Sequence, residues 1–118
     1  MEANDLQKRL FKFAIDVIKA VRKLPKGADY LIISRQLVKS ATSSGANYDE
    51  AQGAVSKADF TNKVRISLRE MRESNYWLRI IQSINETKIA ENELNYLLNE
   101  SKELKNILGA IVTKAEKK

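Results

Sequence analysis

The sequence predicts an all-α protein: an antiparallel up-down-up-down four-helix bundle in a single domain, residues 1–118. Apolar residues recur every three or four positions over most of the chain, and no stretch alternates as a strand does. One proline and four glycines among 118 residues indicate few turns and long elements. The breaks leave four amphipathic segments, as a bundle requires. The expected helices cover about residues 5–23, 28–52, 57–85 and 90–115.

The first expected helix, residues 5–23, is capped by Asp5 and carries two adjacent apolar rows. Its core row runs from Leu6 to Leu24. Phe11, Ile15 and Ile18 form a second row beside it. So wide an apolar arc fits contact with two neighbouring helices or with another subunit, and both alternatives stay open. We assign the second row to an expected oligomer interface.

The second expected helix, residues 28–52, follows the break at Pro25 and Gly27. Its middle, SATSSGAN from Ser40 to Asn47, consists of small and mediocre helix formers. The apolar spacing continues on both sides, so we expect a helix that another helix can approach closely, with a possible bend at Gly45. The rival reading is a loop, with Asn47 capping a new short helix.

The third expected helix, residues 57–85, is the longest element and has three faces. Ser56 and Asp59 have the spacing of a capping box, and Val55 and Phe60 that of a hydrophobic staple. One face is apolar and directed to the core. The second is a basic stripe with one aromatic residue. The third mixes acidic and large apolar residues, among them Ile66, Glu70, Glu73, Trp77, Ile80 and Ile84.

The fourth expected helix, residues 90–115, begins with Glu91 and Glu93 in its first turn, where acidic side chains favour the helix dipole. A leucine-rich stripe from Leu94 to Val112 supplies its share of the core. This helix completes the predicted bundle.

The composition excludes several classes of function. The chain has no histidine and no cysteine, which removes the commonest general base and the usual transition-metal ligands. We therefore expect no enzymatic activity, no metal and no cofactor. No apolar run is long enough to span a membrane, and no signal-peptide pattern is present, so we expect a cytoplasmic protein. A net charge of +6 and a pI near 9.6 favour an anionic partner, nucleic acid first and an acidic protein second.

The basic stripe is the candidate nucleic-acid-binding surface. Arginine forks onto phosphate and stacks on bases, and a tyrosine among arginines can stack on an unpaired base. Lysines of the first helix extend this surface if the two faces adjoin. The alternative is a solvated face that carries no partner. The candidate residues are Arg65, Arg69, Arg72, Tyr76 and Arg79, with Lys8, Lys12 and Lys19.

Trp77 has two interpretations. It is either a core residue of the bundle or, with Ile66, Ile80 and Ile84, part of an apolar strip outside the core. Such a strip is typical of an oligomer interface. A heterologous contact that closes on itself would then give a ring of bundles.

Three segments, taken together, resemble one bacterial family. They are DLQKRLFKFAIDVIKAVRKLP from Asp5, QLVKSATSSGANYDEA from Gln36 and SKADFTNKVRISLREMRESNYWLRII from Ser56. They are similar to four-helix-bundle proteins encoded in intervening sequences of 23S ribosomal RNA genes, historically labelled ribosomal proteins. More distantly, the chain resembles accessory proteins of diversity-generating retroelements, which are basic and bind nucleic acid and a reverse transcriptase.

The resemblance implies an up-down bundle, a ring-shaped homopentamer and no enzymatic activity. It also implies that certain positions, which we call the marked positions, are characteristic of the family. Among them, Asn47 and Glu50 are expected to form hydrogen bonds within the bundle. Gly45 stands where relatives often have proline. The marked positions in this sequence are Ser40, Ser43, Ala46, Asn47, Glu50, Glu70, Glu73, Tyr76 and Trp77.

These observations lead to one functional expectation and one alternative. We expect a non-enzymatic, basic, self-associating bundle that binds nucleic acid, RNA ahead of DNA, through its arginine and lysine faces. The alternative is a protein-interaction or scaffold module of a mobile element with no direct role at nucleic acid.

Overall fold

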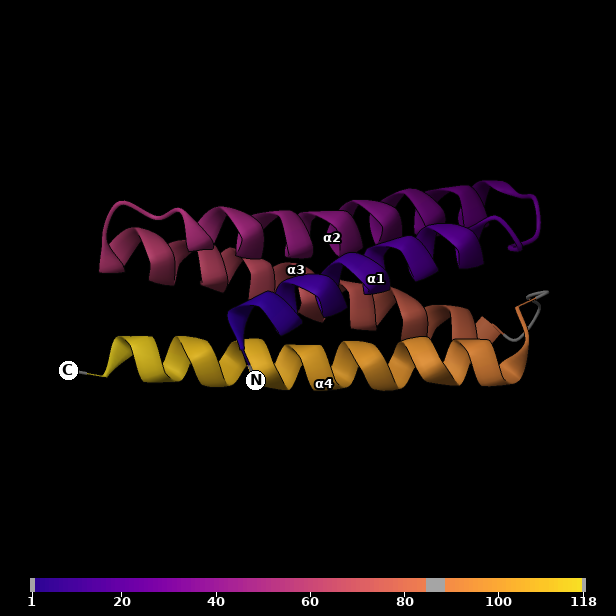
Figure 1. Ribbon diagram of the computed structural model, residues 1–118. Coiled ribbons are helices and arrows are strands. Elements are labelled where there is room, and N and C mark those ends of the chain that lie inside the picture. The colour runs from indigo at the N-terminus through magenta and orange to yellow at the C-terminus, as the bar shows by residue number, and fades with distance from the viewer. Residues whose placement is uncertain (1, 85–88, 118) are drawn as a thin grey trace.

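The computed structural model describes residues 2–84 and 89–117 and contains four helices over those residues. They are α1 (Ala3–Val21), α2 (Ala28–Gln52), α3 (Lys57–Ile84) and α4 (Glu91–Glu116) (Figure 1). Neither described range contains a strand, so the all-α prediction is confirmed. The expected bounds agree to within two residues, although residue 85, the expected end of the third helix, lies outside the described residues.

The helices lie side by side along an elongated body of 47 × 24 × 20 Å. Figure 1 shows the α1–α2 and α2–α3 connections at opposite ends of this body, and the end of α3 at the same end as the start of α4. Around the bundle, α1 lies next to α2 and α4, and α3 lies next to the same two helices; within the described residues, no Cα atoms of the diagonal pairs α1–α3 and α2–α4 come within 8 Å of each other. Each helix thus has two neighbours, and α1 and α3 lie at opposite corners of the bundle.

A continuous apolar core runs along the axis of the bundle. Every helix contributes side chains that are almost completely buried, at the helical spacing that the sequence shows. The largest of these are Phe13, Leu6, Leu10, Leu37, Met71, Leu78, Ile81, Leu97, Leu104 and Leu108.

The small-residue centre of α2 is uninterrupted helix, so the loop alternative is wrong. Low intrinsic propensity is overridden by tertiary contact, because small side chains let α2 approach a neighbour on each side. Toward α3, the Ser40 and Ser74 hydroxyl oxygens lie 2.8 Å apart. Toward α1, a Cβ placed on Gly45 would lie 3.5 Å from the Leu10 Cβ. A large side chain at either place would push the helices apart.

The start of α3 confirms the expected capping box and corrects the staple. The Asp59 N–H donates to Ser56 Oγ at 3.0 Å. The Asp59 carboxylate accepts a hydrogen bond of 3.2 Å from the N–H of Val55, one residue before the usual donor of a capping box. The Val55 side chain is 93% exposed, so it does not pack on Phe60 as a staple would. The hydrogen bonds of the capping box therefore fix the start of this helix, and no hydrophobic staple accompanies them.

None of the helices, over the residues that the structure describes, is long and apolar enough to cross a membrane.

Candidate nucleic-acid interface

One side of α4 directs its carboxylates toward α1, where they form ion pairs. Lys23 Nζ lies 2.7 Å from Glu93 Oε1. Arg9 donates from Nε and Nη2 to the two oxygens of Glu100, each at 2.8 Å, and Nη2 also reaches Glu103 at 2.7 Å. These contacts bind α1 and the turn after it, which contains Lys23, to α4, and they place these three acidic groups on the side of α4 that meets α1.

Between residues 95 and 109, the side of α4 that meets α3 is basic and rich in amides. Two adjoining open hollows lie there, of about 450 and 670 Å³, and they share Asn75, Arg79 and Lys105. We call them together the α3–α4 groove. Among the described residues, no carboxylate lines either hollow. The remaining lining residues are Arg72, Gln82, Asn95, Leu98, Asn99, Lys102, Asn106 and Gly109.

A buried amide anchors the groove. Asn75 is 9% exposed, and its Nδ2 donates to Ser101 Oγ on α4 at 2.8 Å. Its Oδ1 accepts a hydrogen bond of 3.0 Å from Arg79 Nε. Ser101 in turn donates to the carbonyl oxygen of Leu98 at 2.9 Å. The network fixes one edge of the Arg79 guanidinium and leaves its terminal nitrogens without a partner among the described residues, so they are available to an anion.

An aromatic pair adjoins the groove on α3. Tyr76 is half exposed, and the guanidinium carbon of Arg79 lies 5.7 Å from its ring centroid, within cation–π range. Trp77 meets Tyr76 edge-on, with centroids 5.3 Å apart and planes at 75°. Trp77 Nε1 donates to Glu73 at 3.3 Å. The half-buried indole thus supports the exposed tyrosine from the side.

The structure divides the basic stripe that the sequence predicts. Arg72 and Arg79 line the groove, and Tyr76 lies beside Arg79. Arg65 instead forms an ion pair with Glu116 of α4, and Arg69 is exposed outside the groove lining. Therefore only two of the four arginines, Arg72 and Arg79, remain candidates for binding an anion in the α3–α4 groove.

The lysines of α1 do not join the arginines, because α1 and α3 are diagonal to each other and, over the described residues, none of their Cα atoms lie within 8 Å of each other. Lys8 and Lys19 are exposed. Lys12 Nζ binds Asp16 at 2.6 Å and the Tyr96 hydroxyl at 3.1 Å, contacts that raise the pKa of Lys12. The condition under which these lysines would extend the stripe is not met.

Sequence reasoning missed Lys102, Lys105 and Asn75, which complete the groove. A signal existed, since lysines and amides recur at helical spacing along one side of the fourth helix. That spacing does not tell which neighbour the side meets. Only the pairing of α4 with α3 brings these cations to the arginines.

The contacts of the marked positions lie mainly within the fold. Asn47 Nδ2 donates to the Ser43 carbonyl at 2.9 Å and to Ser43 Oγ at 3.1 Å, one turn away. Glu50 is exposed and makes no side-chain hydrogen bond within the described residues, so no intramolecular bond of the expected kind is present there. The half-buried Glu70 accepts a hydrogen bond from Ser74 through its carbonyl oxygen.

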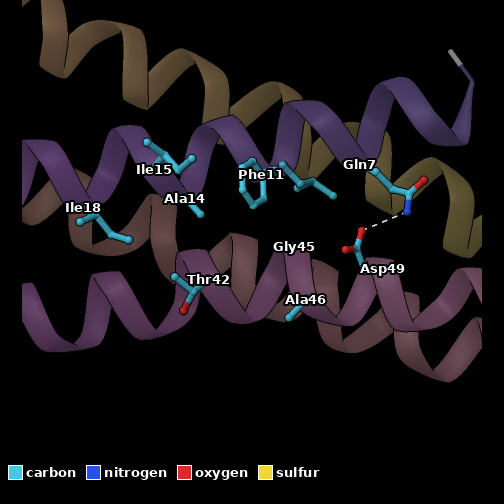
Figure 2. Close-up of a pocket in the computed structure, with 10 residues that line it drawn as sticks. Gln7, Phe11, Ala14, Ile15, Ile18, Thr42, Gly45, Ala46 and Asp49 are labelled. Carbon is cyan, nitrogen blue, oxygen red and sulfur yellow. Dashed lines mark hydrogen bonds between the residues drawn. The ribbon is translucent and has the colours of Figure 1, made fainter.

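The expected interface residues of α1 line an apolar groove between α1 and α2. Phe11 is 68% exposed and Ile15 37%, while Ile18 is half-buried. Figure 2 shows them beside Gly45 and Ala46 in a hollow of about 320 Å³. Gln7 donates to Asp49 at 3.1 Å across the two helices near one end.

The expected interface residues of α3 have a different setting. Ile66, Trp77, Ile80 and Ile84 are half-buried, and all but Ile66 pack against the core. This side of α3 is therefore mainly the margin of the core and not a separate apolar strip. The sequence reasoning also overlooked Leu31 and Ile32 on α2, which are more than half exposed.

The fold and the groove define the class of protein: a basic four-helix protein with a cationic groove between two of its helices. The chain belongs to the 23S rRNA-intervening sequence protein family, whose model matches residues 2–110. It is similar to a crystal structure of a protein of unknown function from the S23 ribosomal protein family of Bacteroides thetaiotaomicron VPI-5482. The two are 31% identical, with a TM-score of 0.83, over 96% of this chain and 99% of the other. No curated protein matches.

Proposed function

We propose that this protein is a non-enzymatic nucleic-acid-binding protein that holds the phosphates of RNA along the α3–α4 groove. The main observation that supports this proposal is that no carboxylate is found in the described lining of the groove, which contains Arg72, Arg79, Lys102 and Lys105. In a chain with 15 acidic residues, such segregation creates a local positive potential. Three acidic side chains of α4, Glu93, Glu100 and Glu103, are turned away from it and paired with cations of α1 and of the turn after α1.

The dimensions of the groove suit a run of phosphates. Arg72 and Arg79 are two helical turns apart, about 10 Å along α3. That separation lets the two guanidinium groups contact different phosphates of one strand. Lys102 and Lys105 approach from α4 across the same hollows, so cations face the backbone from both sides.

Two observations support RNA ahead of DNA in this proposal. Side-chain amides occur along the groove between the cations, and amides can bond to 2′-hydroxyls and to base edges of unpaired RNA. The family's description also refers to a ribosomal RNA sequence. The proposal assigns no catalytic step and no cofactor, and it places the protein in the cytoplasm.

The test is a binding titration of single-stranded RNA, structured RNA and duplex DNA at two salt concentrations. Four phosphate contacts predict a slope of log K against log salt of about −3 for single strands, or about a 50-fold loss between 50 and 200 mM salt. The variant Arg72→Gln/Lys105→Gln removes two contacts, so its slope should be about −1.4.

The matched control is Lys8→Gln/Lys19→Gln, which makes the same change in net charge on α1. It should leave the slope close to that of the wild type. Equal weakening by the two variants would show that only net charge matters and would contradict the groove assignment. Absence of binding by the wild type at low salt would overturn the proposed function.

We also propose that the helices form an antiparallel up-down-up-down bundle that assembles into a ring, a homopentamer by resemblance. Opposite directions are supported by contact pairs such as Ser40–Ser74 and Ser44–Ser67, whose numbers rise on one helix as they fall on the other. Self-association is supported by the exposed apolar groove of α1 and α2.

Light scattering checks the assembly. A mass near 13.4 kDa at every concentration would contradict it. Phe11→Ser should lower the oligomer mass, whereas Val55→Ser, at an apolar residue 93% exposed, serves as the control and should not.

The exposed apolar residues also favour a second candidate function, a protein-interaction module. Phe11, Leu31 and Ile32 would then contact another protein. Capture of one defined protein from nuclease-treated extract, lost in Phe11→Ser and retained in Arg72→Gln/Lys105→Gln, would support this function over RNA binding.

A further inference from the structure

Arg79 lies where three hollows meet. It lines both hollows of the α3–α4 groove, and it also lines a third, of about 320 Å³, together with Tyr76, Ile80, Ser83 and Ile84. The groove is polar and cationic. The third hollow, which we call the Tyr76 hollow, has an aromatic ring and two aliphatic side chains. One guanidinium therefore separates a place for anions from a place for an apolar, planar group.

The chemistry of the Tyr76 hollow fits a nucleobase. A base offers a flat π-face, which stacks on an aromatic ring or on a guanidinium plane. Tyr76 and Arg79 supply these two partners side by side, and Ile80 and Ile84 supply apolar contact. The volume lies at the lower end of the range for small-ligand sites.

Both stacking partners are held in place before any ligand arrives. Arg79 is fixed through Nε by the buried Asn75. Tyr76 rests against the edge of Trp77, which is itself bonded to Glu73. A site whose side chains are fixed by such supporting contacts loses little entropy on binding.

We propose that the preferred ligand is nucleic acid with an unpaired base at this point. One base leaves the stack and lies in the Tyr76 hollow against Tyr76 and Arg79, while the flanking phosphates follow the α3–α4 groove. This inference rests on the proposed function and specifies its substrate class as single strands, loops or bulges. A continuous duplex is a poorer ligand, because its bases are stacked and paired inside.

The experiment compares two fluorescently labelled single-stranded RNA 10-mers, one complete and one with three central abasic positions, at one salt concentration. The phosphates are the same in both. The wild type should bind the complete RNA at least about five-fold more tightly, which is the lower end of a single stacking contribution. Tyr76→Ala should bind both RNAs equally, and Tyr76→Phe, which keeps the ring, should restore the preference.

Tyr96→Ala is the matched control, since Tyr96 is also a partly exposed tyrosine but contacts Lys12 on the α1 side. It should discriminate as the wild type does. Trp77 gives a second readout, because it is the single tryptophan and touches Tyr76. Its fluorescence should change with the complete RNA and not with the abasic one.

Equal binding of the two RNAs by the wild type would overturn this inference while leaving the proposed function intact. Loss of binding to both RNAs would instead be a failure of the proposed function. If a second copy of the chain covers the Tyr76 hollow, Tyr76→Ala will lower the oligomer mass and leave the RNA preference unchanged, which also overturns the inference.

Discussion

Ser44 and Ser67 each donate a hydrogen bond to the other's backbone carbonyl oxygen across the α2–α3 interface. Ser44 Oγ lies 2.8 Å from the Ser67 oxygen, and Ser67 Oγ lies 2.7 Å from the Ser44 oxygen. Both side chains are fully buried. Such an exchange requires the two backbones to be close, and only small side chains allow that approach.

The first prediction concerns this contact. Ser67→Ala should cost about 1 kcal/mol of unfolding free energy, because one buried hydrogen bond is lost and little space is left empty. Ser67→Leu should cost about 1–3 kcal/mol, since the larger side chain forces α2 and α3 apart. Urea unfolding of both variants gives the values, with the exposed Ser83→Leu as the control. Equal stability of Ser67→Leu and the wild type would show that the helices are not tightly apposed there.

Two glycines should respond oppositely to alanine. At Gly109, within α4, an added Cβ would meet no atom within 4 Å, so Gly109→Ala should stabilise the protein by about 1 kcal/mol through helix propensity. Gly27, before α2, has a φ of 148°, which L-residues rarely adopt, so Gly27→Ala should destabilise it. Thermal unfolding compares the two, and a shift of the same sign in both would contradict this account.

The capping box predicts a dependence of stability on pH. The Asp59 carboxylate accepts hydrogen bonds first from Lys63 Nζ, at 2.5 Å, and then from the Val55 N–H, and these lower the pKa of Asp59. Because the folded pKa lies below the unfolded value of about 3.9, the stabilisation is complete above that value and is lost as the pH falls through the folded pKa.

The measurement is the melting temperature of the wild type and of Asp59→Asn between pH 2 and 7. The advantage of the wild type should be constant near neutral pH and should shrink in the acid range. A difference that does not change with pH would mean that the ionised carboxylate contributes nothing to this helix start.

The Arg9 clamp between α1 and α4 predicts unequal effects of two acidic residues. The side chain of Glu100 is 12% exposed and that of Glu103 is 64% exposed, although both bind the same guanidinium. Glu103→Gln should change the unfolding free energy by less than about 1 kcal/mol, as exposed ion pairs do. Glu100→Gln should cost about 1.5–3 kcal/mol, because a charge-assisted bond is weakened in a more buried place. Similar losses in both variants, measured by urea unfolding, would refute the role of burial.

Local signals were sufficient for most of the architecture. The helical spacing of the apolar residues predicted the four helices with nearly the observed bounds, since burial of one stripe is what stabilises a bundle helix. The Ser56–Asp59 box also formed as expected. The staple failed because the apolar spacing of Val55 says nothing about where the chain enters the helix, and the structure leaves its side chain in solvent.

The candidate site was only partly predictable. Arg72, Tyr76 and Arg79 share one face of α3 by local periodicity, so a sequence is enough to group them. Arg65 belongs to the same face but pairs with Glu116, a residue 51 positions away. No local pattern specifies which charges of different helices will meet.

The helices, the core stripes and the basic character follow from local sequence patterns, because each depends on residues within a few turns of one another. The site, in contrast, depends on how the four helices pack against one another. Packing places α4 between α1 and α3, so that Glu100 and Glu103 meet Arg9 of α1 and Glu93 meets Lys23 in the turn after α1, while Lys102 and Lys105 meet the arginines of α3. The physical reason is that rotation of a helix about its axis is set by core packing against both neighbours, and that rotation selects which polar face each neighbour receives.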